Sequence, residues 1–285
     1  MNVLITGARG QLGTDLQAVF AAAGHHRVLA AGRGVIDVAD REQVLGVSGS
    51  FGPDLIVHAA AWTAVDACES DPDRAWAVNA LGSRHVAEAA RLSGAHLLAV
   101  STDYVFDGTS PRPYTEWDRT NPMSAYGRSK MAGEIEVLEG APGSAVVRTA
   151  WVCGVHGSNM VKTVLRLSAG RDRLSFVDDQ HGCPTFTDDL AAMIYRLGVA
   201  RLPGRFHVTN QGPTTWYQFA RDVVAAAGRD PDMVSPISTA ELTPPRPAPR
   251  PANSVLDNAA LRLSGIPLLP DHREALERTV KALLS

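Results

Sequence analysis

The stretch "NVLITGARGQLG", Asn2 to Gly13, joins an apolar run to a glycine-rich turn and the start of a helical segment. Gly7, Gly10 and Gly13 stand three residues apart. Glycines at this spacing permit a tight turn and let the backbone approach a pyrophosphate group. Three glycines alone are a weak signal, but their place between a strand and a helix predicts a dinucleotide-binding βαβ unit.

The alternation of short apolar runs and helical stretches continues through the first 150 residues. We expect strands over 2–6, 27–31, 54–60, 96–101 and 144–150, and helices over 12–23, 40–47, 74–92 and 124–138. This order is typical of a doubly wound parallel sheet. The predicted fold is therefore α/β, with a Rossmann-like dinucleotide-binding domain over residues 1–150.

The remainder of the chain, residues 151–285, has a more mixed pattern. Strands are expected over 174–178 and 205–210, and helices over 160–168, 188–197, 216–227 and 272–284. We predict a smaller mixed α/β substrate-binding domain, with some segments returning to the first domain. The proline-rich stretch "TPPRPAPRPANS", 243–254, excludes helix and predicts a surface loop that can close over a ligand.

Composition narrows the class of protein. The chain has 285 residues, 20% of them charged, with a net charge of −3 and a pI near 6.3. The absence of a basic excess argues against nucleic acid or an anionic membrane surface as the partner. Three scattered cysteines, no signal-peptide pattern and no run of about 18 apolar residues predict a cytoplasmic, non-membrane protein with reduced thiols. These cysteines are Cys68, Cys153 and Cys183.

The end of the second predicted strand bears on the choice of cofactor. A carboxylate about 20 residues after the glycines would bind the ribose hydroxyls of NAD. This chain has Gly32-Arg33-Gly34 there, and Arg33 suits the extra phosphate of NADPH. An exposed surface arginine is the alternative. Asp37, next to Val38, remains available near the adenine, so use of NADH stays open.

Tyr126 and Lys130 stand four residues apart on a predicted helix, so both project from one face. An ammonium group near a phenol stabilises the phenolate and moves the pKa of the phenol toward neutrality. The fourth predicted strand ends in Ser101-Thr102, and one of these hydroxyls is expected to face Tyr126. These features together favour a nicotinamide-dependent oxidoreductase.

No metal site is expected. His181 follows the pair Asp178-Asp179, but this stretch lacks a recognisable ligand spacing. His58 ends a buried strand, where a hydrogen-bonded core histidine is the favoured interpretation over a functional one.

Several longer segments resemble the extended short-chain dehydrogenase/reductase family, in particular its members that reduce nucleotide-linked ketosugars. They include "AAAWTAVDACESDP" (59–72), "STDYVFDG" (101–108), "NPMSAYGRSKMAGE" (121–134) and "DDQHGCPTFTDDLA" (178–191). The resemblance extends over nearly the whole chain in the family's order.

The resemblance implies hydride transfer from NAD(P)H to C4 of dTDP-4-dehydro-L-rhamnose, giving dTDP-L-rhamnose. Tyr126 would protonate the oxygen with help from Lys130, and Thr102 would orient the carbonyl. Tyr104 stands where related 4,6-dehydratases carry a glutamate, so elimination would lack its base. A non-catalytic, dinucleotide-binding regulatory subunit and a reductase or epimerase of another nucleotide ketosugar are the alternatives.

Further roles are implied by the same resemblance. Cofactor contacts are expected from Gly10, Gln11 and Leu12 at the pyrophosphate and from Ala61, Trp62 and Thr63 near the ribose. Substrate contacts are expected from Val65, Asp103, Tyr104 and Trp151, and from Arg250 or Arg246 at the diphosphate. A homodimer is one expected assembly.

Overall fold

The computed structural model describes all of residues 1–285 and contains a six-stranded parallel sheet. In sheet order the strands are β2 (Arg27–Ala31), β1 (Asn2–Thr6), β3 (Leu55–His58), β4 (His96–Thr102), β5 (Ala145–Thr149) and β10 (Gly204–His207). The order reverses between β1 and β3, and the loops after these two strands diverge there to form a crevice. The predicted Rossmann-like α/β fold is confirmed.

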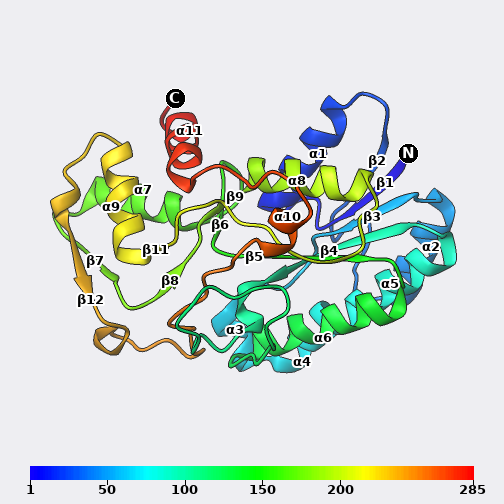
Figure 1. The fold of residues 1–285 in the computed structure, drawn as a ribbon, viewed down its shortest axis with the longest axis horizontal. Coiled ribbons are helices and arrows are strands. Elements are labelled where there is room, and N and C mark those ends of the chain that lie inside the picture. The colour runs from blue at the N-terminus through cyan, green and yellow to red at the C-terminus, as the bar shows by residue number, and fades with distance from the viewer.

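Helices cover both faces of this sheet (Figure 1). One face carries α1 (Gln11–Ala22), α8 (Thr187–Val199) and α10 (Ala259–Leu263), and the other carries α2 (Arg41–Phe51), α5 (Gly82–Ser93) and α6 (Ala125–Gly140). Val3 and Ile5 pack toward α1 and α8, whereas Leu4 between them packs toward α2 and α5. Burial on both faces explains why the strands are almost continuously apolar.

The smaller lobe consists of three helices and short two-stranded ladders (Figure 1). The helices are α7 (Met160–Gly170), α9 (Trp216–Ala226) and α11 (His272–Leu284). The ladders pair β6 (Val152–Cys153) with β9 (Thr185–Phe186), β7 (Leu174–Val177) with β12 (Val234–Ile237), and β8 (His181–Gly182) with β11 (Thr214–Thr215). Although β10 and α8 follow residue 150, they pack in the larger lobe, and the division into two domains at that residue stays a prediction.

The stretch predicted as one helix over 74–92 is interrupted, so that prediction is wrong in part. It consists of α4 (Pro72–Trp76), a π-helical turn η1 (Ala77–Leu81) and α5, preceded by α3 (Val65–Ser70). Asn79 in the π turn bonds the backbone N–H and C=O of Trp62 and the hydroxyl of Ser129. The turn therefore fixes the loop after β3. Three 3-10 turns complete the fold: η2 (Asp103–Val105), η3 (Pro231–Met233) and η4 (Thr239–Glu241).

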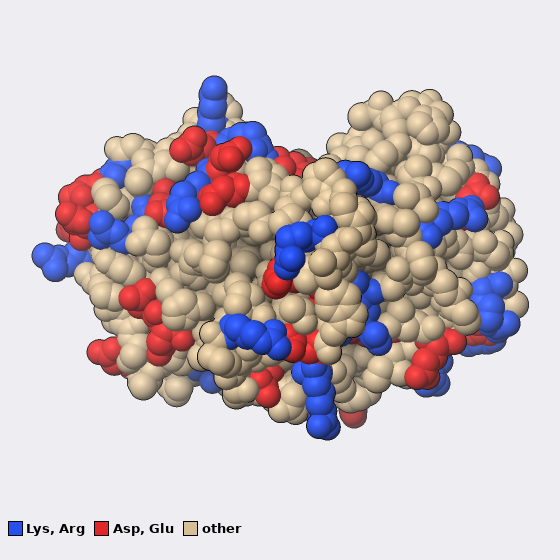
Figure 2. Space-filling model, viewed as in Figure 1, with Lys and Arg blue, Asp and Glu red and all other residues tan.

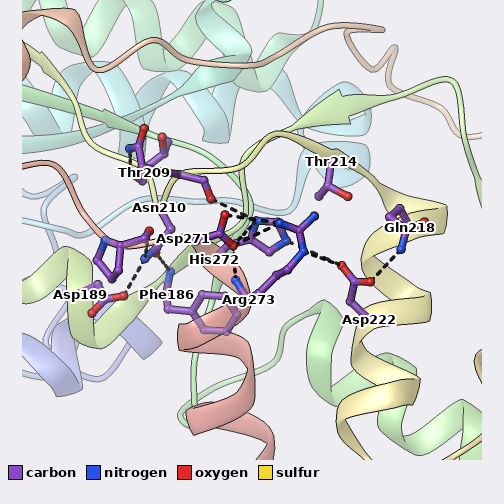
Figure 3. Close-up of polar contacts among 12 residues, drawn as sticks. Phe186, Asp189, Thr209, Asn210, Thr214, Gln218, Asp222, Asp271, His272 and Arg273 are labelled. Atoms are coloured by element: carbon purple, nitrogen blue, oxygen red, sulfur yellow. Dashed lines mark hydrogen bonds and ion pairs between the residues drawn. The ribbon is translucent and has the colours of Figure 1, made fainter.

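Polar contacts join the start of α11 to the rest of the molecule (Figure 3). Asn210 accepts from the backbone N–H of Phe186 and donates to Asp189 at 2.6 Å and to the carbonyl of Pro270 at 3.2 Å. His272, which is completely buried, lies with Nδ1 3.2 Å from the carbonyl of Gln211. These bonds connect α8 of the larger lobe with α11 of the smaller one.

Acidic and basic side chains are interspersed over the face shown in Figure 2. No helix combines the length and the apolar character needed to cross a membrane.

Candidate active site

A cavity of about 420 Å³ lies at the carboxyl ends of β1, β3, β4 and β5. Its walls come from the turn after β1, the loop after β3, the polar end of β4 and the first turns of α6. The predicted site residues that line it are Gly7, Gly10, Gln11, Leu12, Gly13, Ala61, Thr63, Val65, Thr102, Asp103, Tyr104, Tyr126, Lys130 and Trp151. Residues far apart in the chain thus meet where parallel α/β sheets bind ligands.

The glycine turn leaves the beginning of α1 open. Gly7 has a φ of +68°, and a Cβ at this position would lie 2.6 Å from the backbone nitrogen of Ala60. Gly10 precedes α1 and no side chain caps the helix amides. Unpaired N–H groups and the positive end of the helix dipole favour a phosphate at this point. The turn therefore fits the pyrophosphate of a dinucleotide.

A second cavity of about 200 Å³ continues from the first. Both are lined by Gly7, Gly10 and Ala61, so one elongated ligand can occupy both. The second cavity also contains Arg33, Asp37 and Val38, three residues expected at the adenosine end of the cofactor. Arg33 is exposed, which leaves its guanidinium free to meet a phosphate.

The two hydroxyls at the end of β4 have different partners. Ser101 donates to a carboxylate oxygen of Glu134, a residue that does not line this cavity. Thr102 donates to Asp103 Oδ1 at 2.9 Å, and its hydroxyl partly offsets the rise that burial causes in the pKa of Tyr126. Of the two hydroxyls considered from the sequence, Thr102 therefore faces the tyrosine.

Tyr126 lies in the first turn of α6, which begins after the capping side chain of Ser124. Its ring packs edge-to-face on Tyr104, with centroids 5.7 Å apart, and it is only 7% exposed. Burial raises the pKa of Tyr126, because a phenolate loses hydration in the closed site. The sequence predicts that Lys130 lowers this pKa, but in the folded chain burial is the dominant influence.

Lys130 lies one turn after Tyr126 on the same wall of the cavity. Its ammonium group donates to the carbonyl of Val100 at 2.8 Å. Burial lowers the pKa of Lys130 to about 8, partly offset by the negative charge of Glu134. The side chain therefore remains mostly charged at neutral pH.

A stacked tryptophan pair lines one part of the cavity, and the sequence predicts only one member of it, Trp151. Trp151 and Trp216 have ring centroids 3.5 Å apart and planes within 6° of parallel. Trp151 has a φ of +46°, an unusual conformation for a residue with a side chain. We did not predict Trp216, because nothing in its helical surroundings in the sequence indicates that it meets Trp151 at the pocket wall.

Three predicted contact residues, Trp62, Arg246 and Arg250, lie outside the lining of both cavities. The ring of Trp62 is covered by Arg74, whose guanidinium carbon lies 4.5 Å from the ring centroid. Arg250, in the proline-rich loop, pairs with Asp66 at the start of α3, with Nη2 2.8 Å from Oδ2. The backbone N–H of Ala248 also donates to Asp66, at 3.1 Å. The loop is thus tied beside the pocket residue Val65.

The histidine and the acidic pair that the sequence raised as further candidates have internal partners. His58 is buried, with its ring nitrogens 2.8 Å from the hydroxyl of Thr6 and 3.2 Å from that of Ser83. Asp178 accepts from Thr215, and Asp179 accepts from Thr239. No group of three or more potential metal ligands is present.

A family model described as "RmlD substrate binding domain" matches residues 1–285. The chain belongs to this family. A family member from Streptomyces griseus, named dTDP-4-dehydrorhamnose reductase, is 44% identical, with 98% of this chain and 93% of the relative aligned. One from Streptomyces niveus, named dTDP-4-keto-6-deoxy-D-glucose reductase, is 41% identical, with 92% and 91% aligned.

Solved structures agree with this membership of the RmlD family. The crystal structure of dTDP-4-dehydrorhamnose reductase from Bacillus anthracis, in complex with NADP, is similar with a TM-score of 0.95. The two chains are 39% identical, and the match covers 99% of each. The resemblance inferred from the motifs is therefore confirmed over the whole chain.

Proposed function

We propose that this chain reduces the C4 keto group of dTDP-4-dehydro-L-rhamnose to dTDP-L-rhamnose with NADPH. The convergence of Thr102, Tyr126 and Lys130 in one cavity, continuous with the open start of α1, is the observation that carries the proposal. The names of the Streptomyces griseus and Bacillus anthracis relatives support this reaction.

The residues present fit a phosphorylated nicotinamide dinucleotide. The uncapped amides of α1 would hold the pyrophosphate, and Arg33 would meet the 2′-phosphate. The bound cofactor supplies the hydride. Lys130, fixed on the cavity wall by Val100, would hydrogen-bond the nicotinamide ribose.

The proton comes from the chain itself. Because burial raises the pKa of Tyr126, its phenol is protonated at neutral pH and available to the developing alkoxide on C4. Lys130 stabilises the phenolate that remains. Thr102 would orient the C4 oxygen, and its place in the same cavity as Tyr126 and Lys130 supports this role.

The substrate would occupy the end of the cavity formed by Val65, Tyr104 and Trp151, with Asp103 beneath Thr102. Arg250 would bind the diphosphate after releasing its partner Asp66.

The enzyme would act in the cytoplasm, where its three free cysteines stay reduced, and as a homodimer.

Cofactor absorbance at steady state tests the proposal. The purified chain is mixed with NADPH or NADH and with dTDP-4-dehydro-L-rhamnose, with dTDP-4-keto-6-deoxy-D-glucose in a parallel series. Oxidation of NADPH with the first sugar and formation of dTDP-L-rhamnose are expected. Turnover only with the second sugar would reassign the substrate. Tight cofactor binding without turnover of either would indicate a regulatory subunit.

A further inference from the structure

A very small cavity, of about 10 Å³, adjoins Lys130 inside the larger lobe. Its polar lining consists of Ser83 from α5, Ser101 from β4, and Lys130 and Glu134 from α6. A volume of roughly 10–15 Å³ with several polar neighbours is what one buried water molecule needs. The cavity is therefore suited to a single water beside the lysine.

The ammonium of Lys130 has unused hydrogen-bonding capacity. It carries three N–H donors, and only the carbonyl of Val100 accepts from it within the chain. One remaining donor is available to the ligand cavity that Lys130 also lines. The other can reach a water in the small cavity, which would connect it to the carboxylate of Glu134.

Glu134 is held rigidly in the interior. Arg148 on β5 donates to both of its oxygens, with Nη2 2.7 Å from Oε2 and Nε 2.9 Å from Oε1, and Ser101 adds a third donor. The two charged side chains are 5% and 3% exposed. Phe106 covers the guanidinium, which lies 5.1 Å from its ring centroid.

A buried ion pair of this kind contributes little to stability compared with apolar side chains of the same size, because both charges lose their hydration. Stability alone therefore does not explain why an ion pair, and not an apolar pair, stands at this point. Its place one helical turn from Lys130, with a water-sized cavity between them, indicates a role in the site instead.

We infer that Glu134 is a positioning residue for Lys130: its carboxylate, fixed by Arg148, acts across the one-water cavity to keep the lysine charged and oriented toward Tyr126. The inference rests on the proposed role of Lys130 in catalysis. Glu134 itself does not line the ligand cavity and touches neither the expected cofactor nor the substrate.

The charged groups around Lys130 determine in which direction its pKa should change when Glu134 is removed. Burial lowers the pKa of Lys130 to about 8, and Glu134 is the one group that raises it. His58 on β3 also faces the lysine but is neutral, since burial lowers its pKa to about 3. Arg148 on β5 is the remaining charge behind Glu134. Without the carboxylate, Lys130 should lose its proton at a lower pH.

Direct titration of Lys130 tests this without any substrate. The chain has only three lysines, Lys130, Lys162 and Lys281, so ¹³C-labelled lysine gives few NMR signals and two internal references. Replacing Glu134 alone would leave Arg148 buried without a partner and could unfold the protein. The informative variant is therefore Glu134→Gln with Arg148→Met, which removes both charges. Glu134→Asp retains the carboxylate.

We expect the double variant to lower the pKa of Lys130 by roughly one unit or more. Glu134→Asp, which keeps a carboxylate, should leave the pKa of Lys130 close to that of the wild type. The matched control is Glu136→Gln with Arg84→Met, because Glu136 lies on the same helix and pairs with Arg84 at the surface. This control should leave Lys130 unchanged. If Lys130 titrates as in the wild type in the folded double variant, the inference is wrong.

The pH profile of kcat gives a second readout. Turnover should fall as pH rises through the pKa of Lys130, so the alkaline limb of the double variant should move to lower pH by the same amount. A uniform fall in kcat with an unshifted alkaline limb would show that Glu134 supports the fold but does not position Lys130. Absence of turnover in the wild type would refute the proposed function, whereas the NMR titration would still decide the role of Glu134.

Discussion

Tyr126 and Lys130 lie one turn apart on the same helix, yet burial moves their pKa values in opposite directions. It raises the pKa of Tyr126 and lowers that of Lys130 to about 8. Both shifts have one cause, because phenolate and ammonium are the charged forms and both lose hydration. At neutral pH the pair is therefore a protonated phenol beside an ammonium group, which is the state needed to reduce a ketone.

Replacing Tyr126 by Phe should reduce kcat by roughly a hundredfold or more, because it deletes the proton donor. NADPH affinity should change little, since the ring and its packing on Tyr104 remain. Stopped-flow turnover and cofactor fluorescence measure the two effects separately. Wild-type turnover in this variant would show that Tyr126 is not the acid.

Replacing Arg33 by Ala should weaken NADPH binding by roughly tenfold or more, because a charged hydrogen bond to the 2′-phosphate is lost. NADH lacks that phosphate and should bind almost as before. Arg41→Ala is the control, since Arg41 is an exposed partner of Glu88 outside both cavities. Equal losses for the two cofactors would make Arg33 an ordinary surface arginine.

Replacing Asp103 by Asn should stabilise the ligand-free protein above pH 6. Burial raises the pKa of Asp103 to about 6, so the folded chain binds this proton more tightly than the unfolded chain. Stability contributed by the group is complete below pH 4 and is lost as pH rises to about 6. Denaturant unfolding at pH 7.5 should show a free energy of unfolding about 1–3 kcal/mol higher in the variant than in the wild type. No gain at pH 7.5, or an equal gain at pH 4, would contradict this.

The elements of the fold differ in how far their own residues determine them. β2 lies where the apolar run 27–31 predicts it, and α11 coincides with the predicted amphipathic helix over 272–284. The expected helix over 74–92 instead contains a π turn. Asn79 in this turn bonds the backbone of Trp62, a contact outside the helix that no periodicity in the sequence reveals.

The junction between α8 and α11 depends on Asn210, so Asn210→Ala should destabilise the protein by about 1–3 kcal/mol. The substitution leaves the buried N–H of Phe186 without a partner and removes one of the two side chains that donate to Asp189, the other being Arg278. Gln218→Ala, an exposed position in the same cluster, should change stability by less than about 0.5 kcal/mol. Urea unfolding of the two variants gives the comparison. Similar values would show that the buried asparagine is dispensable.

Both lobes contribute to the ligand cavity, which couples cofactor binding to the stability of the whole molecule. Gln11 at the start of α1 donates to the carbonyl of Val152 and accepts from Asn159, so the two halves meet at the expected pyrophosphate site. NADP⁺ at 100 times its Kd should stabilise the fold by about 2.7 kcal/mol and raise Tm by roughly 5 °C.

Differential scanning calorimetry measures this shift. Tyr126→Phe should show the full increase in Tm at saturating NADP⁺, whereas Arg33→Ala at the same NADP⁺ concentration should show a smaller one. An unchanged Tm at saturating NADP⁺ would contradict binding of this cofactor to the folded chain.

Much of the candidate site was predictable because its signals are local. Gly7 marks a turn with positive φ, and the spacing of Tyr126 and Lys130 places both side chains on one helix face whatever surrounds them. The apolar strands alternate with helices, and this order alone indicates a parallel sheet with its ligands at the carboxyl ends.

The remaining features depend on partners that only folding brings together. Trp216 stacks on Trp151, and Arg148 holds Glu134 behind the lysine, across chain separations that leave no periodic signal. The pKa values of Tyr126 and Lys130 likewise depend on loss of water, which every segment around the cavity helps to exclude. The amino-acid order thus specifies the elements and the reacting groups, whereas burial in the assembled fold sets their charge, their orientation and the shape of the pocket.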